Sequence, residues 1–255
     1  MPEGPSIVLL KEEVQQFVGQ EVVGVSGNSR IEQSRLLHQR VQTIRSWGKQ
    51  FLLCFDGFSL RVHFLMFGSY VVNGVKEGRT PRLSLVFANG EINFYACSVK
   101  YLEGDINQLY DWSADVMNDA FSPKKAREKL LAKPDMLVCD AVLEQDIFSG
   151  VGNIIKNEVL YRLRIHPESL VGKLPASKIK ALVAECRIYS FQFLEWKRNY
   201  ELKKHWLAHT KKTCLRCNLP FVKKHTGVKK RRSFFCVKCQ RLYTVPPSLP
   251  ENRDR

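Results

Sequence analysis

Two closely spaced cysteine pairs near the C-terminal end constrain this chain more than any other feature. Cys214 and Cys217 form one C-x-x-C pair, and eighteen residues separate it from the second pair, Cys236 and Cys239. Each pair can supply two thiolates from one turn, and tetrahedral zinc takes four such ligands at about 2.3 Å. The spacing predicts one structural Zn²⁺ per chain, held in a zinc ribbon. The alternative is a redox pair or a coincidence.

The remaining cysteines are scattered through apolar segments and are interpreted as core residues: Cys54, Cys97, Cys139 and Cys186. The N-terminus has no basic region, and its apolar run stops at Lys11, which argues against a signal peptide. No segment approaches the roughly 18–20 apolar residues that span a bilayer. We therefore expect an intracellular protein, cytoplasmic if it is bacterial, with free or metal-bound thiols rather than disulfides.

Positive charge is concentrated near the C-terminal end. The net charge is +15, and residues 197–241 contain fifteen Lys and Arg but one acid, Glu201. The hairpin expected between Lys223 and Phe235 carries much of this charge together with two phenylalanines, which we expect to pack the ribbon. Such a surface favours a polyanionic partner, and we interpret that partner as nucleic acid rather than a membrane.

The hydrophobic pattern predicts an α+β fold. Short alternating or fully apolar runs between residues 21 and 102, separated by Asp-Gly and Asn-Gly turns, are typical of an antiparallel β-sandwich. Helical spacing occurs at residues 5–17, after Ser122-Pro123, which opens a helix, and at 135–143, 153–163 and 178–196. The predicted domains are an N-terminal sandwich with flanking helices (1–117), a helical domain (118–208), a zinc-ribbon finger (209–243) and a mobile tail (244–255).

The first residues suggest chemistry at the N-terminus. Removal of Met1 before the small residue Pro2 would leave a secondary amine, and an α-amine titrates near ~7.7–8.0, so part of it is nucleophilic at neutral pH. Many proteins begin Met-Pro and merely have a loose end. Glu3 alone is equally uninformative, because an acid near a helix N-terminus needs no function.

Taken together, Met1-Pro2-Glu3-Gly4-Pro5 and the following helix resemble the opening of the formamidopyrimidine-DNA glycosylase / endonuclease VIII family. The resemblance covers the chain from residue 1 to about residue 241, and its motifs follow one another in the same order as in the family. It continues with Gly48-Lys49 before an apolar strand, the segment 63–68, the segment 150–154 leading into a helix with Glu158, and Arg231 five residues before Cys236. It implies a bifunctional DNA glycosylase and AP lyase of base excision repair, with a helix-two-turn-helix in the helical domain.

The resemblance also implies roles for four residues. The amine of Pro2 would attack C1′ of the damaged nucleotide and form a Schiff base, and Glu3 would protonate the sugar ring oxygen as general acid. Lys49 would contact the phosphate beside the lesion and transfer protons in β-elimination. Arg231 would clamp the same backbone and assist δ-elimination, a task suited to a planar guanidinium.

Two further segments are implied to contact DNA. Asn153 is expected to bind backbone phosphate at a helix N-terminus, and also to serve as N-cap of a helix that begins at Ile154. Leu65, Met66 and Phe67 are candidates for a wedge that fills the gap left by an everted base. Packing in the core is the alternative for these three side chains.

Some positions depart from the purine-specific branch of the family. Gly4 and Ser6 stand where that branch usually has leucine and glutamate, which favours the endonuclease VIII side and oxidised pyrimidines over 8-oxoguanine. Leu65 stands where the enteric endonuclease VIII has glutamine, and Asp111 lies where a phosphate-binding arginine is expected. We predict damaged, double-stranded DNA as partner and a monomeric protein. The alternative is a non-catalytic zinc-ribbon DNA-binding protein.

Overall fold

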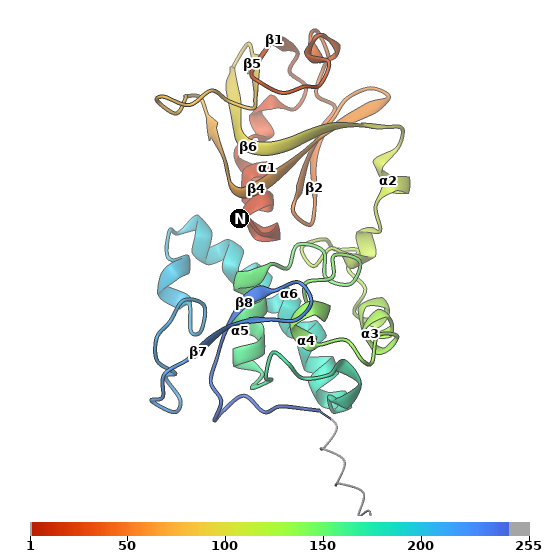
Figure 1. The fold of residues 1–255 in the computed structure, drawn as a ribbon. Coiled ribbons are helices and arrows are strands. Elements are labelled where there is room, and N and C mark those ends of the chain that lie inside the picture. Colours follow the sequence, from red (N-terminus) through yellow and green to blue (C-terminus); the bar gives the residue numbers. More distant parts are fainter. Residues whose placement is uncertain (1, 245–255) are drawn as a thin grey trace, which may run out of the picture.

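Six antiparallel strands form one continuous sheet in the N-terminal half of the chain. The computed structural model describes residues 2–244. The strands follow the order β1-β5-β6-β4-β3-β2 in the sheet (Figure 1). Their bounds are β1 Val22–Ser26, β2 Thr43–Trp47, β3 Gln50–Cys54, β4 Phe58–Val72, β5 Leu83–Phe87 and β6 Gly90–Glu103.

The two long strands, β4 and β6, run through both halves of this sheet. The first half of β4 pairs with β3, whereas the first half of β6 pairs with β5, so each layer receives one half of each long strand. Phe51 of β3 and Phe94 of β6 come from different layers, and their ring centroids lie 5.7 Å apart. The apolar faces thus share one core, and the predicted antiparallel sandwich is confirmed.

The first helix lies between this sandwich and the rest of the molecule. Helix α1 (Gly4–Glu13) buries Ile7 and Leu10 in the sandwich core. A 3₁₀ turn, η1 (Gln15–Phe17), follows it, so the helical segment predicted for residues 5–17 exists in two parts. In Figure 1 the beginning of α1 lies at the boundary with the helical half.

A second hydrophobic core occupies the helical half. The principal helices are α3 (Pro123–Leu131), α4 (Val138–Ala141), α5 (Asn153–Arg162) and α6 (Ala176–Arg198). Ser122 caps α3 as its sequence predicts, accepting the Lys125 N–H at 3.3 Å. The predicted helix at 135–143 is much shorter than expected. The shorter elements are η2 (Gln33–Leu36), α2 (Ile106–Leu109), η3 (Trp112–Ala114), η4 (Val171–Lys173) and η5 (Leu202–His205).

The last regular element is a hairpin that packs against α5. Strands β7 (Val222–Thr226) and β8 (Arg231–Phe235) pair antiparallel, and Figure 1 shows them crossing the front of α5. Phe234 and Phe235 are buried, so they pack rather than stack on a ligand, and the Phe235 ring lies against His166 of the helical half. The predicted mobile tail, apart from Thr244, lies outside the described residues. No helix within residues 2–244 is both long and apolar enough to cross a membrane.

Candidate active site

Three segments distant in sequence meet where the two halves of the protein touch. The Gly4 N–H donates to the Gly150 carbonyl oxygen at 2.9 Å. The turn between β2 and β3 enters the same junction, where Gly48 has φ +53° and donates its N–H to Asp115 Oδ2 at 3.0 Å. A Cβ on Gly48 would overlap the Ser149 hydroxyl, so this backbone approach requires glycine. The junction brings Pro2, Glu3 and Lys49 to the start of α5.

Glu3 caps helix α5 from the other end of the chain. Its carboxylate oxygens accept the N–H groups of Gly152 at 3.1 Å, Ile154 at 2.7 Å and Ile155 at 3.2 Å. A Cβ on Gly152 would overlap this carboxyl. The expectation that Asn153 caps this helix is wrong, because the helix already includes Asn153 and its free N–H groups are taken by Glu3.

Burial changes the acid–base properties of this cluster. Glu3 is only 3% exposed, and burial raises its pKa against the opposing effects of Lys49 and the three backbone donors. Burial likewise lowers the pKa of Lys49 to about 8, although the nearby Glu3 carboxylate favours its charged form. An acid retained closer to neutral pH and an amine that releases its proton more readily therefore lie side by side.

A cavity of about 380 Å³, lined largely by polar residues, lies beside Lys49 and the start of α5. Lys49, Arg231 and Asn153 all line it, together with His63 and Gln145. The Asn153 Oδ1 atom is buried and has no hydrogen-bond partner among the described residues. The structure thus brings three of the predicted site residues to one cavity, where two cations can meet a phosphate.

Arg231 is held at this cavity by contacts that sequence analysis did not identify. The carbonyl of its neighbour Arg232 accepts bonds from Asn153 Nδ2 at 3.0 Å, Lys156 Nζ at 3.2 Å and Asn157 Nδ2 at 3.3 Å. These donors project from one face of α5, so the helix that Glu3 caps also fixes the start of β8. In the sequence, the only sign of this contact is the i, i+3, i+4 spacing of Asn153, Lys156 and Asn157, which places three polar side chains on one face of the helix.

The turn between β7 and β8 has its own anchor in the helical half. Asp140 of α4 is 4% exposed and accepts the N–H groups of Val228 at 2.7 Å and Lys229 at 3.2 Å. Sequence analysis did not single out Asp140, because an acid within a short apolar segment carries no motif. It fixes the end of the hairpin from which Arg231 reaches the cavity.

A second and larger cavity, of about 630 Å³, has Pro2 in its wall. Aromatic residues of both halves surround it, Phe64 and Tyr70 from β4 and Trp206 after η5. Tyr200 is 97% exposed at its rim, with φ +58°. The volume and the aromatic walls suit a planar heterocycle, and the half-buried Pro2 would face it.

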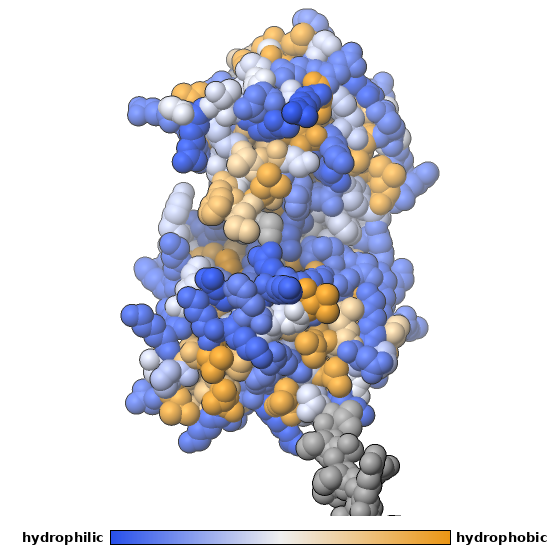
Figure 2. Space-filling model, viewed as in Figure 1, coloured by the Kyte–Doolittle hydropathy of each residue, from blue (hydrophilic) through white to orange (hydrophobic). Residues whose placement is uncertain are grey.

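The segment Leu65–Met66–Phe67 protrudes from the sheet. Pairing of β4 with β6 is interrupted between Phe64 and Ser69, and the three side chains are 51%, 62% and 83% exposed, respectively. Core packing, the alternative considered for them, is therefore wrong. In Figure 2 apolar residues gather on the sandwich where it overlooks the boundary with the helical half.

The four predicted metal ligands converge in the ribbon. The Sγ atoms of Cys214, Cys217, Cys236 and Cys239 all lie within 4.8 Å of one another. Tetrahedral ligation at ~2.3 Å places sulfur atoms about 3.8 Å apart, and Cys214 and Cys239 are separated by 3.7 Å. Arg216 lies 3.7 Å from the Cys239 sulfur and offsets thiolate charge. The donor set fits a soft metal ion. The other four cysteines are buried, as predicted for core residues.

Comparison with known protein families accounts for most of the chain. Residues 1–98 match the formamidopyrimidine-DNA glycosylase N-terminal domain, and residues 113–188 match the H2TH domain of the same glycosylase. Mouse Endonuclease 8-like 3 is 29% identical over 206 residues, covering 78% of this chain and 34% of that protein. Human Endonuclease 8-like 2 is 36% identical over 151 residues, covering 54% of this chain and 44% of that protein.

Solved structures share the whole fold. The Lactococcus lactis formamidopyrimidine-DNA glycosylase bound to DNA containing an AP site has a TM-score of 0.81 at 22% identity, covering 93% of this chain and 99% of that one. A viral DNA glycosylase has the same TM-score at 18% identity, with the same coverage. The chain spans about a third of the length of the mouse relative. With both domain models matched, the chain belongs to the formamidopyrimidine-DNA glycosylase / endonuclease VIII family, on its endonuclease VIII-like side.

Proposed function

We propose that this protein is a DNA glycosylase and AP lyase of base excision repair that acts through the N-terminal amine of Pro2. The observation that carries this proposal is the position of Glu3. A carboxyl group with a raised pKa lies one residue from the amine, at the junction where Lys49 also lies. Family membership supports the class of reaction, and the activity and its substrates are proposed here for this chain.

The reaction begins at the damaged nucleotide. After removal of Met1, the unprotonated amine of Pro2 attacks C1′, and the bond from C1′ to the base breaks with its electron pair leaving on the base. The departing base takes up the proton that the Pro2 nitrogen loses, which restores the lone pair on that nitrogen. Glu3 donates a proton to the sugar ring oxygen, the ring opens, and a Pro2–C1′ iminium forms. The buried position of Glu3 supports this role, because burial raises the pKa of its carboxyl group.

Strand cleavage follows from the iminium. It acidifies the proton on C2′, and loss of this proton expels the 3′ phosphate in β-elimination. Lys49 serves in this proton transfer, supported by its lowered pKa of about 8. A further elimination expels the 5′ phosphate, with Arg231 held against the same backbone. Both cations line the polar cavity next to Asn153, which supports phosphate binding there.

The zinc ribbon has a structural part in this proposal. Cys214, Cys217, Cys236 and Cys239 would hold Zn²⁺ with all four positions filled by protein, so the ion would stabilise the hairpin and leave the chemistry to the N-terminus. We propose double-stranded DNA as partner and Leu65, Met66 and Phe67 as the wedge, supported by their exposure at the domain boundary. We favour oxidised pyrimidines as the lesions, because Gly4 and Ser6 differ from the residues usual in the purine-specific branch.

Borohydride trapping tests the mechanism directly. Untagged protein and a Pro2→Gly variant are incubated with duplexes containing an abasic site, 5-hydroxyuracil or 8-oxoguanine, and cyanoborohydride reduces any imine to a stable adduct. We expect a covalent complex with the wild type that is lost or strongly reduced in the variant, at equal DNA affinity. Binding without any trapped complex would instead support the non-catalytic zinc-ribbon protein.

A further inference from the structure

A groove on the helical half lies apart from both cavities of the candidate active site. It has a volume of about 850 Å³ and runs between α3 and α6. None of its lining residues contributes to the cavity that holds Pro2 or to the cavity that holds Lys49 and Arg231. The proposed glycosylase reaction therefore leaves this surface unexplained.

Apolar side chains of α6 form the floor of the groove, between the charged residues Lys180 and Arg187 of the same helix. Ile179, Leu182 and Cys186 point into the core of the helical half. Ala184 and Ile188 recur on the other face, and Ile188 is 49% exposed. A surface helix normally presents a polar face to solvent, so a half-exposed isoleucine in the floor of a groove indicates a partner.

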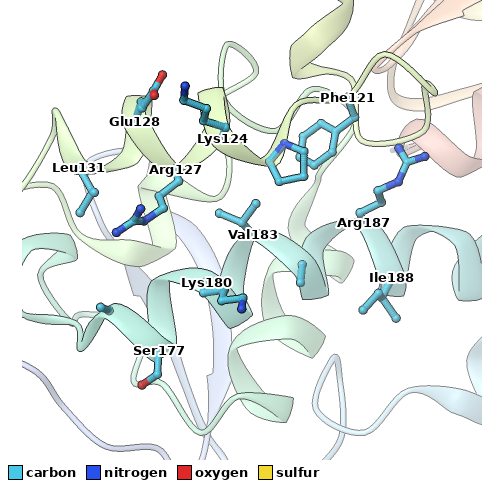
Figure 3. A pocket seen from close by; sticks show the side chains of 13 residues that line it. Phe121, Lys124, Arg127, Glu128, Leu131, Ser177, Lys180, Val183, Arg187 and Ile188 are labelled. Carbon is cyan, nitrogen blue, oxygen red and sulfur yellow. The ribbon is translucent and has the colours of Figure 1, made fainter.

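The ends of the groove are apolar as well. In Figure 3, Val183 points from α6 toward α3, with Phe121 at one end of the space and Leu131 at the other. Leu131 is 45% exposed. Helix α3 has nine residues and is about 14 Å long at 1.5 Å per residue. A channel of this length beside two helices accommodates two to three turns of a third helix.

The rim of the groove is positively charged and largely unpaired. Lys124, Arg127 and Lys180 make no ion pair with any residue of the described part of the chain, and Glu128 is the one acid in the lining. Lys124 also lies in the first turn of α3, where the helix dipole disfavours a cation. Arg187 differs, because it donates to the carbonyls of Val116 at 2.9 Å and Asn118 at 2.6 Å.

We propose that the α3–α6 groove binds an acidic amphipathic helix of a partner protein. Apolar side chains at i, i+3 or i+4 and i+7 of that helix would fill the floor, and its Asp and Glu residues would meet Lys124, Arg127 and Lys180. The apolar floor argues for a protein ligand rather than DNA, since phosphates and sugars gain little from an apolar surface. The proposal is independent of the glycosylase chemistry.

The test starts from the whole protein and a probe that assumes no partner. A phage-displayed library of random 16-residue peptides is selected on the protein in excess undamaged duplex DNA, and enriched peptides are synthesised with a fluorophore and titrated by anisotropy. We expect enriched sequences rich in Asp and Glu, with Leu, Phe or Ile at helical spacing. Absence of enrichment over beads without protein would overturn the proposal.

Matched variants locate the binding site. Lys124→Glu combined with Arg127→Glu, and separately Ile188→Asp, should weaken the selected peptides by at least about tenfold. Lys125→Glu, on the same helix but outside the lining, should change affinity by less than about twofold. All variants should keep wild-type duplex affinity and lyase rate. Equal peptide affinity in all variants would contradict the groove, and a loss of duplex affinity in the Lys124→Glu, Arg127→Glu variant would identify a nucleic-acid surface instead.

Discussion

The carboxylate of Glu3 lies on the first turn of α5 and accepts the Ile154 N–H at 2.7 Å. The residue next to the proposed nucleophile is thus also the cap of the helix whose side chains hold Arg232 and the start of β8. Glu3 is therefore one of the contacts that connect the N-terminus to the helical half and, through α5, to the ribbon. A change at Glu3 should therefore affect chemistry first and domain packing second.

Replacing Glu3 by Gln tests the acid. The substitution retains an oxygen for α5 but removes the transferable proton, so we expect base release from a lesion-containing duplex to slow by about 10²–10⁴-fold. Single-turnover rates measure this, and anisotropy on an abasic-analogue duplex checks that binding persists. Glu77→Gln, on an exposed turn, is the control. An unchanged rate of base release would remove Glu3 from the mechanism.

Lys49→Met should separate activity from stability. We expect slower β-elimination on a preformed abasic site together with a gain in unfolding free energy on the order of 1 kcal/mol at pH 7, because a poorly hydrated charge is removed. Lys49→Arg should keep duplex affinity while remaining slow, since a guanidinium does not release its proton. Normal elimination by either variant would contradict the proposed proton transfer.

The same lysine predicts a pH dependence of stability. Its folded pKa of about 8 lies below the ordinary value, so the folded protein binds fewer protons than the unfolded chain between about pH 8 and 10.4. The charged Lys49 therefore destabilises the folded protein fully below about pH 8, and this destabilisation disappears above about pH 10.4. Chemical denaturation should therefore show wild type gaining stability relative to Lys49→Met as pH rises from 8 to 10.

Asp115 predicts the opposite trend at acidic pH. Burial raises its pKa to about 6 although it accepts the Gly48 N–H. A raised acid contributes stability that is present below about pH 3.9 and is lost as pH rises through about 6. Between about pH 4 and 7 the unfolding free energy of the wild type should therefore fall relative to that of Asp115→Asn. A constant difference would show that Asp115 does not titrate in this range.

The ribbon predicts a metal-dependent loss of DNA affinity. Cys236→Ser should release zinc and free the hairpin, because binding energy and folding of such sites are coupled. Metal content by mass spectrometry and duplex affinity by anisotropy should fall together as Arg231 loses its position. Cys139→Ser, a buried cysteine outside the cluster, should retain one zinc. Zinc still tightly bound in Cys236→Ser would contradict the four-ligand assignment.

The exposed tip predicts an effect limited to duplex substrates. Replacing Leu65, Met66 and Phe67 together by Ala should change stability by no more than about 0.5 kcal/mol, as expected for exposed side chains. Base release from duplex DNA should slow, whereas release from a single strand, which has no gap to fill, should not. Val75→Ala, at another exposed apolar residue, is the control. Equal slowing on both substrates would exclude a wedge role.

The sequence by itself determined the parts of this protein that depend on local pattern. Alternating runs predicted the sandwich, and Ser122-Pro123 predicted the start of α3, because pleat period and capping act over a few residues. The two C-x-x-C pairs predicted the cysteine cluster for the same reason. The family resemblance named Pro2, Glu3, Lys49 and Arg231, and their proposed roles stay predictions.

Tertiary structure alone decided how these parts combine. Glu3, rather than Asn153, accepts the free N–H groups at the start of α5. This contact joins residues about 150 positions apart, and no local preference encodes it. Lys156 and Asp140 anchor the hairpin for the same reason, and neither belongs to a motif. Burial of Glu3 and Lys49, and with it their shifted pKa values, arises only when the two halves close on one another, because desolvation is a property of the assembled interior.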